Sequence, residues 1–419
     1  MEKTKYFPTI EAIDRASEVL GEILEPTPFM KNNNLSDVYE ANVFLKREDL
    51  QMVRSYKIRG AYNKIRSIDP ETLKKGIVCA SAGNHAQGVA FSCSKLQIIG
   101  SIFMPTTTPK QKIEQVKMFG KEFIEIVLTG DTFDAANAAA IAFAEESGRT
   151  FIPPFDDPKV MEGQGTIGRE ILNQTNIKLD YVFVPIGGGG LASGLGSYFK
   201  MMSPETKIIG VEPGGAPCMK AAIEAGELVE LEHIDKFVDG AAVKKAGALT
   251  YQICKEVLDD IIIVPEGAVC TTIIQMYNKS AIVVEPAGAL ASAALRFYAD
   301  KIKGKNVACI VSGSNNDITR MEEIREKSLL YEGLKHYFIV NFPQKSGEIL
   351  SFIRDVIGPE DDLVYIQYIK KTNKNFGPAL IGIELARKED FKSLTERMDK
   401  HGISYEYINE NNKLFDILI

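Results

Sequence analysis

The chain has 419 residues, a formal net charge of −7 and a charged share of 25%. This length exceeds one compact domain, so we expect two or three units. The acidic balance argues against nucleic acid as a partner. No apolar run is long enough to cross a membrane, and the charged first twenty residues do not resemble a signal peptide. Six cysteines without a C-x-x-C pair predict reduced thiols in a cytoplasmic protein.

Residues 75–315 alternate between short runs rich in Val and Ile and segments with helical periodicity. Such runs predict parallel strands covered on both faces by helices. They occupy 76–81, 99–105, 122–128, 180–186, 207–213 and 307–315. The sequence therefore predicts an α/β region with two three-layer αβα lobes. The small lobe takes about 55–150, the large lobe takes 1–54 and 151–320, and a ligand cleft lies between them.

The pattern changes after residue 317. A charged helical segment, 318–336, predicts a connecting helix. The order strand–helix–strand–strand–helix–strand follows over 337–343, 346–358, 363–371, 379–386, 389–402 and 403–409. This βαββαβ order is typical of a ferredoxin-like domain. We therefore expect one domain at 1–330 and a second at 331–419.

The stretch RSYKIRGAYNKI, residues 54–65, predicts a short amphipathic helix with Ser55 as its N-cap. Lys57 would lie in the first turn, where the helix dipole disfavours a cation. Desolvation there would lower its pKa, as a Schiff-base lysine requires. From this stretch alone, a solvated surface lysine is the better interpretation, because lysine is rarely buried.

The run PIGGGGLASGLG, residues 185–196, follows an apolar strand and opens a helix. Its backbone N–H groups predict a phosphate site at a helix N-terminus. Gly187, Gly189 and Ala192 also satisfy G-x-G-x-x-A, and Glu212 stands where a ribose-binding acid would lie. A dinucleotide site therefore remains an alternative to another phosphate ligand.

Two further polar stretches follow strands. SAGNHAQGVA, residues 81–90, makes either an anion-binding corner or a capped helix with a satisfied histidine, and VSGSNND, residues 311–317, alone indicates only a polar turn. The four histidines lack metal-ligand spacing, so no metal site is expected. The sequence contains no G-x-S-x-G motif, so a serine hydrolase is not expected.

Together, these stretches resemble the pyridoxal-phosphate enzymes of the tryptophan-synthase β fold, and within them the threonine dehydratases. The motifs S-x-K-x-R-G-A, S-x-G-N-H-x-Q-G-x-A, G-G-G-G-L, E-P-A-G-A and S-G-x-N occur here in that family's order. The resemblance covers essentially the whole chain, and the combination is far more specific than any single motif. The C-terminal unit is similar to the amino-acid-binding ACT regulatory domain.

This resemblance implies pyridoxal 5′-phosphate as the cofactor, linked to Lys57 as a Schiff base. Tyr56 would lie beside the cofactor ring, Asn84 would bind its phenolic oxygen, and Ser312 its pyridine nitrogen. Backbone N–H groups would hold the phosphate at Gly187, Gly188, Gly189, Gly190 and Leu191.

The family also implies substrate contacts. The substrate carboxylate would lie at Ser81, Gly83, Asn84 and His85, and Gly240 would border the substrate. Some relatives bind a metal ion near the position of Glu212, with an aspartate where this chain has Cys218. That replacement argues against a divalent site here.

The implied activity is conversion of L-threonine into 2-oxobutanoate and ammonia, the first step towards isoleucine. The C-terminal domain would bind a regulatory amino acid, with isoleucine inhibiting and valine opposing it, in a homo-oligomer that is a dimer or tetramer. Three alternatives remain. They are a serine dehydratase or racemase with the same lobes, a nicotinamide-dependent dehydrogenase, and an inactive amino-acid-sensing module.

Overall fold

The computed structural model describes residues 6–369 and 375–410, and it divides the chain into two compact units after Ile318. The sequence places the boundary about twelve residues later, near 330. The helix that contains residue 330, α15 Met321–Tyr331, belongs to the second unit because it packs against that unit's sheet.

The larger sheet of the first unit has the order β1-β2-β10-β7-β8-β9. All neighbouring strands are parallel except β1, which runs antiparallel to β2. Parallel strands of this kind need helical crossovers. The strands are β1 Phe29–Lys31, β2 Asn42–Arg47, β7 Tyr181–Pro185, β8 Lys207–Pro213, β9 Asp260–Val264 and β10 Asn306–Val311.

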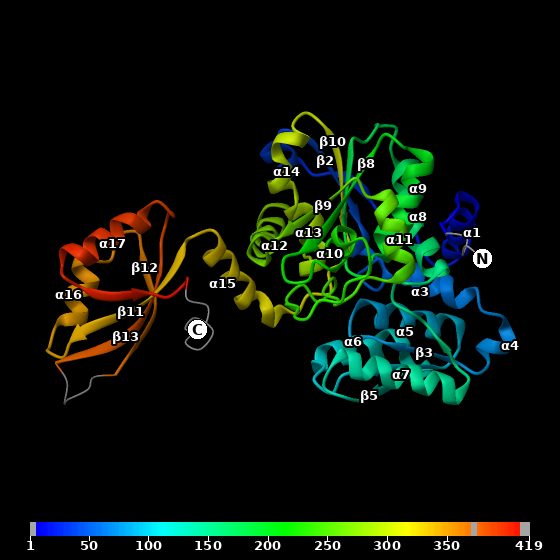
Figure 1. Ribbon diagram of the computed structural model, residues 1–419, viewed down its shortest axis with the longest axis horizontal. Coiled ribbons are helices and arrows are strands. Elements are labelled where there is room, and N and C mark those ends of the chain that lie inside the picture. Colours follow the sequence, from blue (N-terminus) through cyan, green and yellow to red (C-terminus); the bar gives the residue numbers. More distant parts are fainter. Residues whose placement is uncertain (1–5, 370–374, 411–419) are drawn as a thin grey trace. The chain divides into compact units, whose positions relative to one another are not determined.

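Helices cover both faces of the larger sheet, which makes three layers (Figure 1). Val182 and Val184 of β7 point towards α8, α9, α10 and α11, whereas α13 packs on the opposite face with α12 and α14 beside it. These helices are α8 Pro158–Gln174, α9 Gly190–Met202, α10 Cys218–Ala225, α11 Ala248–Val257, α12 Glu266–Ser280, α13 Pro286–Ala293 and α14 Leu295–Ile302.

The smaller sheet is fully parallel, in the order β5-β4-β3-β6. Its strands are β3 Ile77–Ala80, β4 Gly100–Met104, β5 Ile124–Leu128 and β6 Thr150–Phe151. Ile77 and Cys79 face α5 Asn84–Leu96 and α6 Lys110–Gly120, while Val78 and Ala80 face α7 Phe133–Ser147. The two three-layer lobes predicted from the sequence are confirmed.

Short helices complete the first unit. They are α1 Ile10–Gly21, α2 Asn33–Tyr39, α3 Lys57–Arg66, α4 Pro70–Leu73 and the 3-10 turns Glu48–Leu50 and Lys121–Phe123. Within the described part of the chain, no helix is both long and apolar enough to cross a membrane.

The second unit has a four-stranded antiparallel sheet in the order β12-β13-β11-β14, the strand order of a ferredoxin-like fold. Two helices, α16 and α17, cover one face, and Leu330 of α15 packs on the other. The βαββαβ prediction is confirmed, except that residues 370–371 of its second strand lie outside the described residues. The elements are the 3-10 turn Ile318–Arg320, α15 Met321–Tyr331, β11 Lys335–Pro343, α16 Glu348–Asp355, β12 Asp362–Tyr368, β13 Phe376–Glu384, α17 Asp390–Lys400 and β14 Ser404–Tyr407.

Candidate active site

The predicted site residues gather at the carboxyl ends of parallel strands. The glycine run follows β7 and Ser312 follows β10, and these two strands are neighbours in the larger sheet. Asn84 follows β3 of the smaller sheet. Ligands of open α/β sheets bind at this edge, so the topology alone brings the separate motifs towards one site.

Lys57 is the first residue of α3, directly beside the segment that follows β10. The backbone N–H of Tyr56 donates to the carbonyl of Ser312 at 3.1 Å, and Ser55 pairs with Gly313. The predicted N-cap role of Ser55 is wrong, because this pairing holds its backbone in an extended bridge and Tyr56 occupies the cap position. The buried Ser55 hydroxyl has no hydrogen-bond partner among the described residues.

Lys57 is half-buried, and its amino group is held by a backbone carbonyl. Its Nζ donates to the carbonyl of Pro154 at 2.9 Å and lies 5.5 Å from the centre of the Tyr56 ring. Burial lowers the pKa of Lys57 to about 8, although the nearby Glu285 carboxyl acts in the opposite direction. The solvated-lysine interpretation is therefore wrong, and Lys57 can be neutral near physiological pH.

The glycine run has the shape of a cradle that side chains would fill. A Cβ on Gly187 would lie 2.9 Å from the carbonyl oxygen of Ala241, and one on Gly188 would overlap the Phe155 ring. Gly189 has φ +94°, a conformation that favours glycine. The first-turn N–H groups of α9, at Gly190 and Leu191, have no acceptor within the helix and are free to hold an anion.

The side-chain amide of Asn84 has a fixed orientation. Asn315 donates from Nδ2 to Val53 O at 2.9 Å and to Asn84 Oδ1 at 2.6 Å. Asn84 Nδ2 in turn donates to Glu285 Oε1 at 2.6 Å. Because Asn84 Oδ1 already accepts, the amide presents its second N–H, and not its oxygen, to a ligand.

Glu285 belongs to the E-P-A-G-A motif, but the sequence assigned it no role. It is 4% exposed, accepts a hydrogen bond from the Asn84 amide and is close enough to Lys57 to raise the pKa of that lysine. Burial, together with Asp239, raises the pKa of Glu285 to about 7, while the bond from Asn84 lowers it. A buried carboxyl that can change charge near neutral pH is typical of a functional site.

The predicted substrate-side residues surround the N-terminus of α5. Gly83 precedes Asn84 and donates its N–H to the Ser81 hydroxyl at 3.2 Å. Burial lowers the pKa of His85 to about 3, with a further contribution from Lys57, and its Nε2 lies 2.9 Å from Ile152 O. A Cβ on Gly240 would lie 3.5 Å from the Glu285 carboxyl.

Neither the Ser312 hydroxyl nor Glu212 is free in the structure. Ser312 Oγ donates to the carbonyl of Ala287 at 3.1 Å, so it must turn to donate to a ring nitrogen. Glu212 accepts the N–H groups of Met219 and Lys220, each at 2.8 Å, and so caps α10. Burial raises the pKa of Glu212 to about 7. Within residues 6–369 and 375–410, no cluster of three His, Cys, Asp or Glu residues could hold a metal ion.

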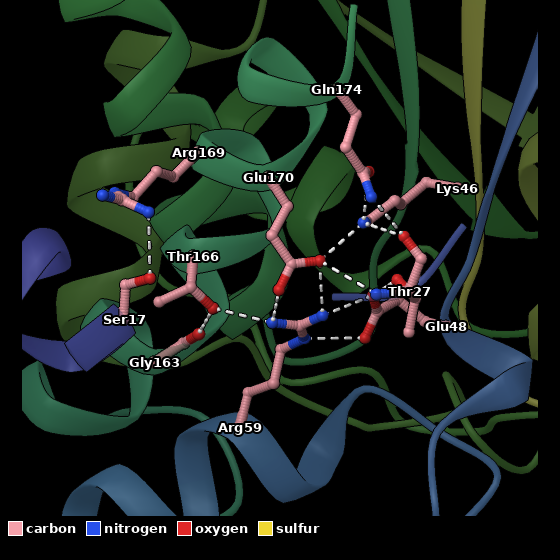
Figure 2. A network of polar contacts seen from close by, with 10 residues as sticks. All are labelled: Ser17, Thr27, Lys46, Glu48, Arg59, Gly163, Thr166, Arg169, Glu170 and Gln174. Atoms are coloured by element: carbon pink, nitrogen blue, oxygen red, sulfur yellow. Dashed lines mark hydrogen bonds and ion pairs between the residues drawn. The ribbon is translucent and has the colours of Figure 1, made fainter. Parts of the chain in front are cut away.

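A buried charge network anchors the helix that carries Lys57 (Figure 2). Arg59 is 1% exposed and donates to both oxygens of Glu48, both oxygens of Glu170 and the Thr166 hydroxyl, at 2.6–3.1 Å. Lys46 adds a second cation, 2.6 Å from Glu170. Bidentate pairs of this kind fix the orientation of the arginine side chain, so the network holds α3 against α8 and β2.

The family of the chain follows from comparison with known proteins. A family model described as pyridoxal-phosphate dependent enzyme matches residues 21–313, and a model of the C-terminal regulatory domain of threonine dehydratase matches residues 326–418. The chain belongs to the threonine dehydratases, within the pyridoxal-phosphate dependent enzymes. It is 57% identical to the L-threonine dehydratase biosynthetic IlvA of Halalkalibacterium halodurans, over 98% of this chain and 99% of that one.

Solved structures agree with this membership. Threonine deaminase isoform 2 from Solanum lycopersicum, in its processed form, is 39% identical, with a TM-score of 0.72 over 77% of this chain and 95% of that one. Maize serine racemase is 30% identical, with a TM-score of 0.71 over 78% and 99% of the two chains.

The cofactor of this family is pyridoxal 5′-phosphate, and the geometry of the site fits it. A lysine with a lowered pKa, a cradle of backbone N–H groups and an amide that presents N–H suit an aldehyde, a phosphate and a phenolic oxygen respectively. The alternative of a dinucleotide site at Gly187, Gly189 and Ala192 is therefore wrong.

Proposed function

We propose that the protein is an L-threonine ammonia-lyase that converts L-threonine into 2-oxobutanoate and ammonia, the first step towards isoleucine. The observation that carries this proposal is the Lys57 amino group, which has a pKa of about 8 and donates to Pro154, next to the Phe155 ring that contacts the glycine cradle. Relatives that match along almost the whole chain support the choice of threonine, because they carry the name threonine dehydratase.

The bound cofactor supplies the electron sink that makes loss of the substrate's α-proton feasible. Lys57 Nζ takes that proton in its neutral form and then, as an ammonium, can deliver a proton to the departing β-hydroxyl. Its lowered pKa suits both directions of transfer near neutral pH. The N–H groups of Gly187, Gly188, Gly189, Gly190 and Leu191 would hold the phosphate, and Tyr56 would lie beside the ring.

The substrate carboxylate binds at the N-terminus of α5, with contributions from Ser81, Gly83, Asn84 and His85. Since the pKa of His85 is about 3, its ring is neutral near pH 7 and offers no cationic charge. The N–H dipoles at the helix start are then the main attraction for the carboxylate. Gly240 leaves room for the substrate beside Glu285.

Ser312 faces the pyridine nitrogen in this proposal. A hydroxyl cannot hold that nitrogen protonated as a carboxylate would, so the ring remains the weaker electron sink. A weaker sink favours prompt loss of the hydroxyl over transamination. Ser312→Asp should therefore increase the share of transamination among the turnover products, and an unchanged product ratio would contradict this role.

We further propose that residues 1–318 form the catalytic domain and that residues 319–419 form the regulatory domain. Isoleucine would inhibit and valine would oppose it, in a homo-oligomer of two or four copies. We place the enzyme in the cytoplasm, since its six cysteines are all buried and include no C-x-x-C pair.

The test is a steady-state assay of oxo-acid release from threonine and from serine, with and without isoleucine. We expect threonine to give the higher kcat/KM and isoleucine to inhibit. A variant that ends at Ile318 should keep turnover and lose the isoleucine response. Serine as the better substrate would favour a serine dehydratase, and unchanged inhibition in the shortened chain would refute the regulatory role.

A further inference from the structure

Three buried side chains donate to carbonyls of the glycine cradle, and the Gly247 N–H adds a longer bond of 3.3 Å to the Gly188 carbonyl. The Gly187 carbonyl accepts from Cys218 Sγ at 3.6 Å, the Gly188 carbonyl from Thr250 Oγ1 at 2.5 Å, and the Gly189 carbonyl from Cys254 Sγ at 3.8 Å. Burial raises the pKa of both thiols, which therefore remain protonated donors. Because a trans peptide is planar, fixing each carbonyl also fixes the N–H of the following residue on the opposite side.

Thr250 is the strongest of these donors, since a hydroxyl bond is shorter and stronger than a thiol bond. The plane that it holds carries the N–H of Gly189, in the middle of the predicted phosphate site. Thr250 is 0% exposed, and its only other hydroxyl contact among the described residues is the Gly247 carbonyl at 3.2 Å.

Asp156 holds Thr250 in place from outside the cradle. Its carboxylate accepts the N–H groups of Ala248, Leu249 and Thr250 at 2.9–3.1 Å and so caps α11. A Cβ on Gly247 would overlap this carboxylate, so the cap requires a glycine at that position.

The same short segment also touches the catalytic lysine. Pro154 accepts from Lys57 Nζ, and the Phe155 ring fills the space that a side chain on Gly188 would need. Three consecutive residues therefore have one contact each: Pro154 with the lysine, Phe155 with the cradle and Asp156 with the N-terminus of α11. Their covalent connection sets the distance between the aldehyde-binding amine and the phosphate-binding peptides.

We propose that Thr250, held by the Asp156 cap, is a positioning residue that aims the Gly189 N–H at the cofactor phosphate. This inference rests on the proposed function, in which the glycine run holds that phosphate. Thr250 touches no substrate atom in this role and acts only through the Gly188 peptide.

The experiment compares Thr250→Val, which removes the hydroxyl at nearly constant volume, with Thr250→Ser, which keeps it. The readouts are the dissociation constants of pyridoxal 5′-phosphate and of pyridoxal, and the ³¹P resonance of the bound phosphate, all in the full-length protein. The matched control is Thr206→Val, because Thr206 is a buried threonine that donates to Leu179 O at 2.9 Å outside the predicted site.

Thr250→Val should weaken pyridoxal 5′-phosphate binding about three- to tenfold, the range of one net hydrogen bond, and shift the ³¹P resonance. It should leave the affinity for pyridoxal unchanged, and Thr250→Ser should restore the wild-type values. Equal affinity in wild type and Thr250→Val, or the same loss in Thr206→Val, would overturn the inference. A wild-type protein that binds no pyridoxal 5′-phosphate would instead overturn the proposed function.

Discussion

Replacing Arg59 by methionine should destabilise the first unit by about 3–5 kcal/mol, the cost of breaking a buried ion pair. Arg59 makes hydrogen bonds to Glu48, Glu170 and Thr166 while only 1% exposed. Methionine fills a similar length but leaves the buried Glu48 carboxylate and the partly buried Glu170 carboxylate with Lys46 as the remaining cation of the network. At roughly 2 °C per kcal/mol for a unit of this size, the Tm should fall by roughly 6–10 °C.

The assay is thermal unfolding of the full-length protein, followed by circular dichroism at pH 7. Arg169→Ala is the control, because its ion pair with Asp14 is partly exposed and should contribute about 0–1 kcal/mol. The double variant Arg59→Met/Glu48→Gln removes one charge of each sign and leaves the Lys46–Glu170 pair in place. It should melt closer to wild type than Arg59→Met alone.

Equal Tm values for Arg59→Met and Arg169→Ala would refute this reasoning, because burial would then add nothing to the ion pair. A double variant less stable than Arg59→Met would also contradict it. In that case the loss would come from missing hydrogen bonds and not from an unpaired buried charge.

Three further predictions concern the cofactor site. Asn315→Asp cannot donate to Asn84 Oδ1, so the Asn84 amide should turn and no longer donate to the phenolic oxygen of the cofactor. The visible band of the lysine-linked cofactor should then titrate at higher pH. A titration at the wild-type pH would show that Asn315 does not fix the amide. Gly188→Ala should raise the cofactor dissociation constant at least about fivefold, because its Cβ would overlap the Phe155 ring. An unchanged dissociation constant would show that the loop can move to accept the methyl group. Because only neutral amine attacks an aldehyde and the pKa of Lys57 is about 8, attachment of cofactor to the apoenzyme should accelerate up to about pH 8 and then level off. A rate that keeps rising towards pH 10 would indicate an unshifted lysine.

The sequence predicted what local patterns determine. Val- and Ile-rich runs marked most parallel strands, and the glycine run marked the cradle because few structural turns need four glycines. The strands β1, β2, β6 and β9 were not among the predicted strands, and for β1 and β6 the reason is that two or three residues carry no periodicity. Ser55 was misjudged as a cap because its backbone pairs with Gly313, more than 250 residues later.

Other parts of the site depend on contacts that no local pattern indicates. In the sequence, Thr250 has no feature that distinguishes it from other helix residues. Only the fold brings its hydroxyl to the carbonyl of Gly188. Glu285 lay inside a quoted motif, yet its partner Asn84 is 201 residues away. The pair Asp157–Pro158 does indicate a helix start, because aspartate followed by proline is typical of an N-cap and the first helical position. The Pro154–Asp156 segment directly precedes this pair.

The most direct test of the role of Lys57 is the rate of 2-oxobutanoate release from L-threonine by wild type and by Lys57→Ala. Both full-length proteins are supplied with pyridoxal 5′-phosphate, and the visible absorbance of each is recorded. We predict turnover by wild type, and in Lys57→Ala the loss of the lysine-linked band with a rate decrease of about a thousandfold. A variant that keeps both the band and the turnover, or a wild type that releases no 2-oxobutanoate, would contradict the assignment.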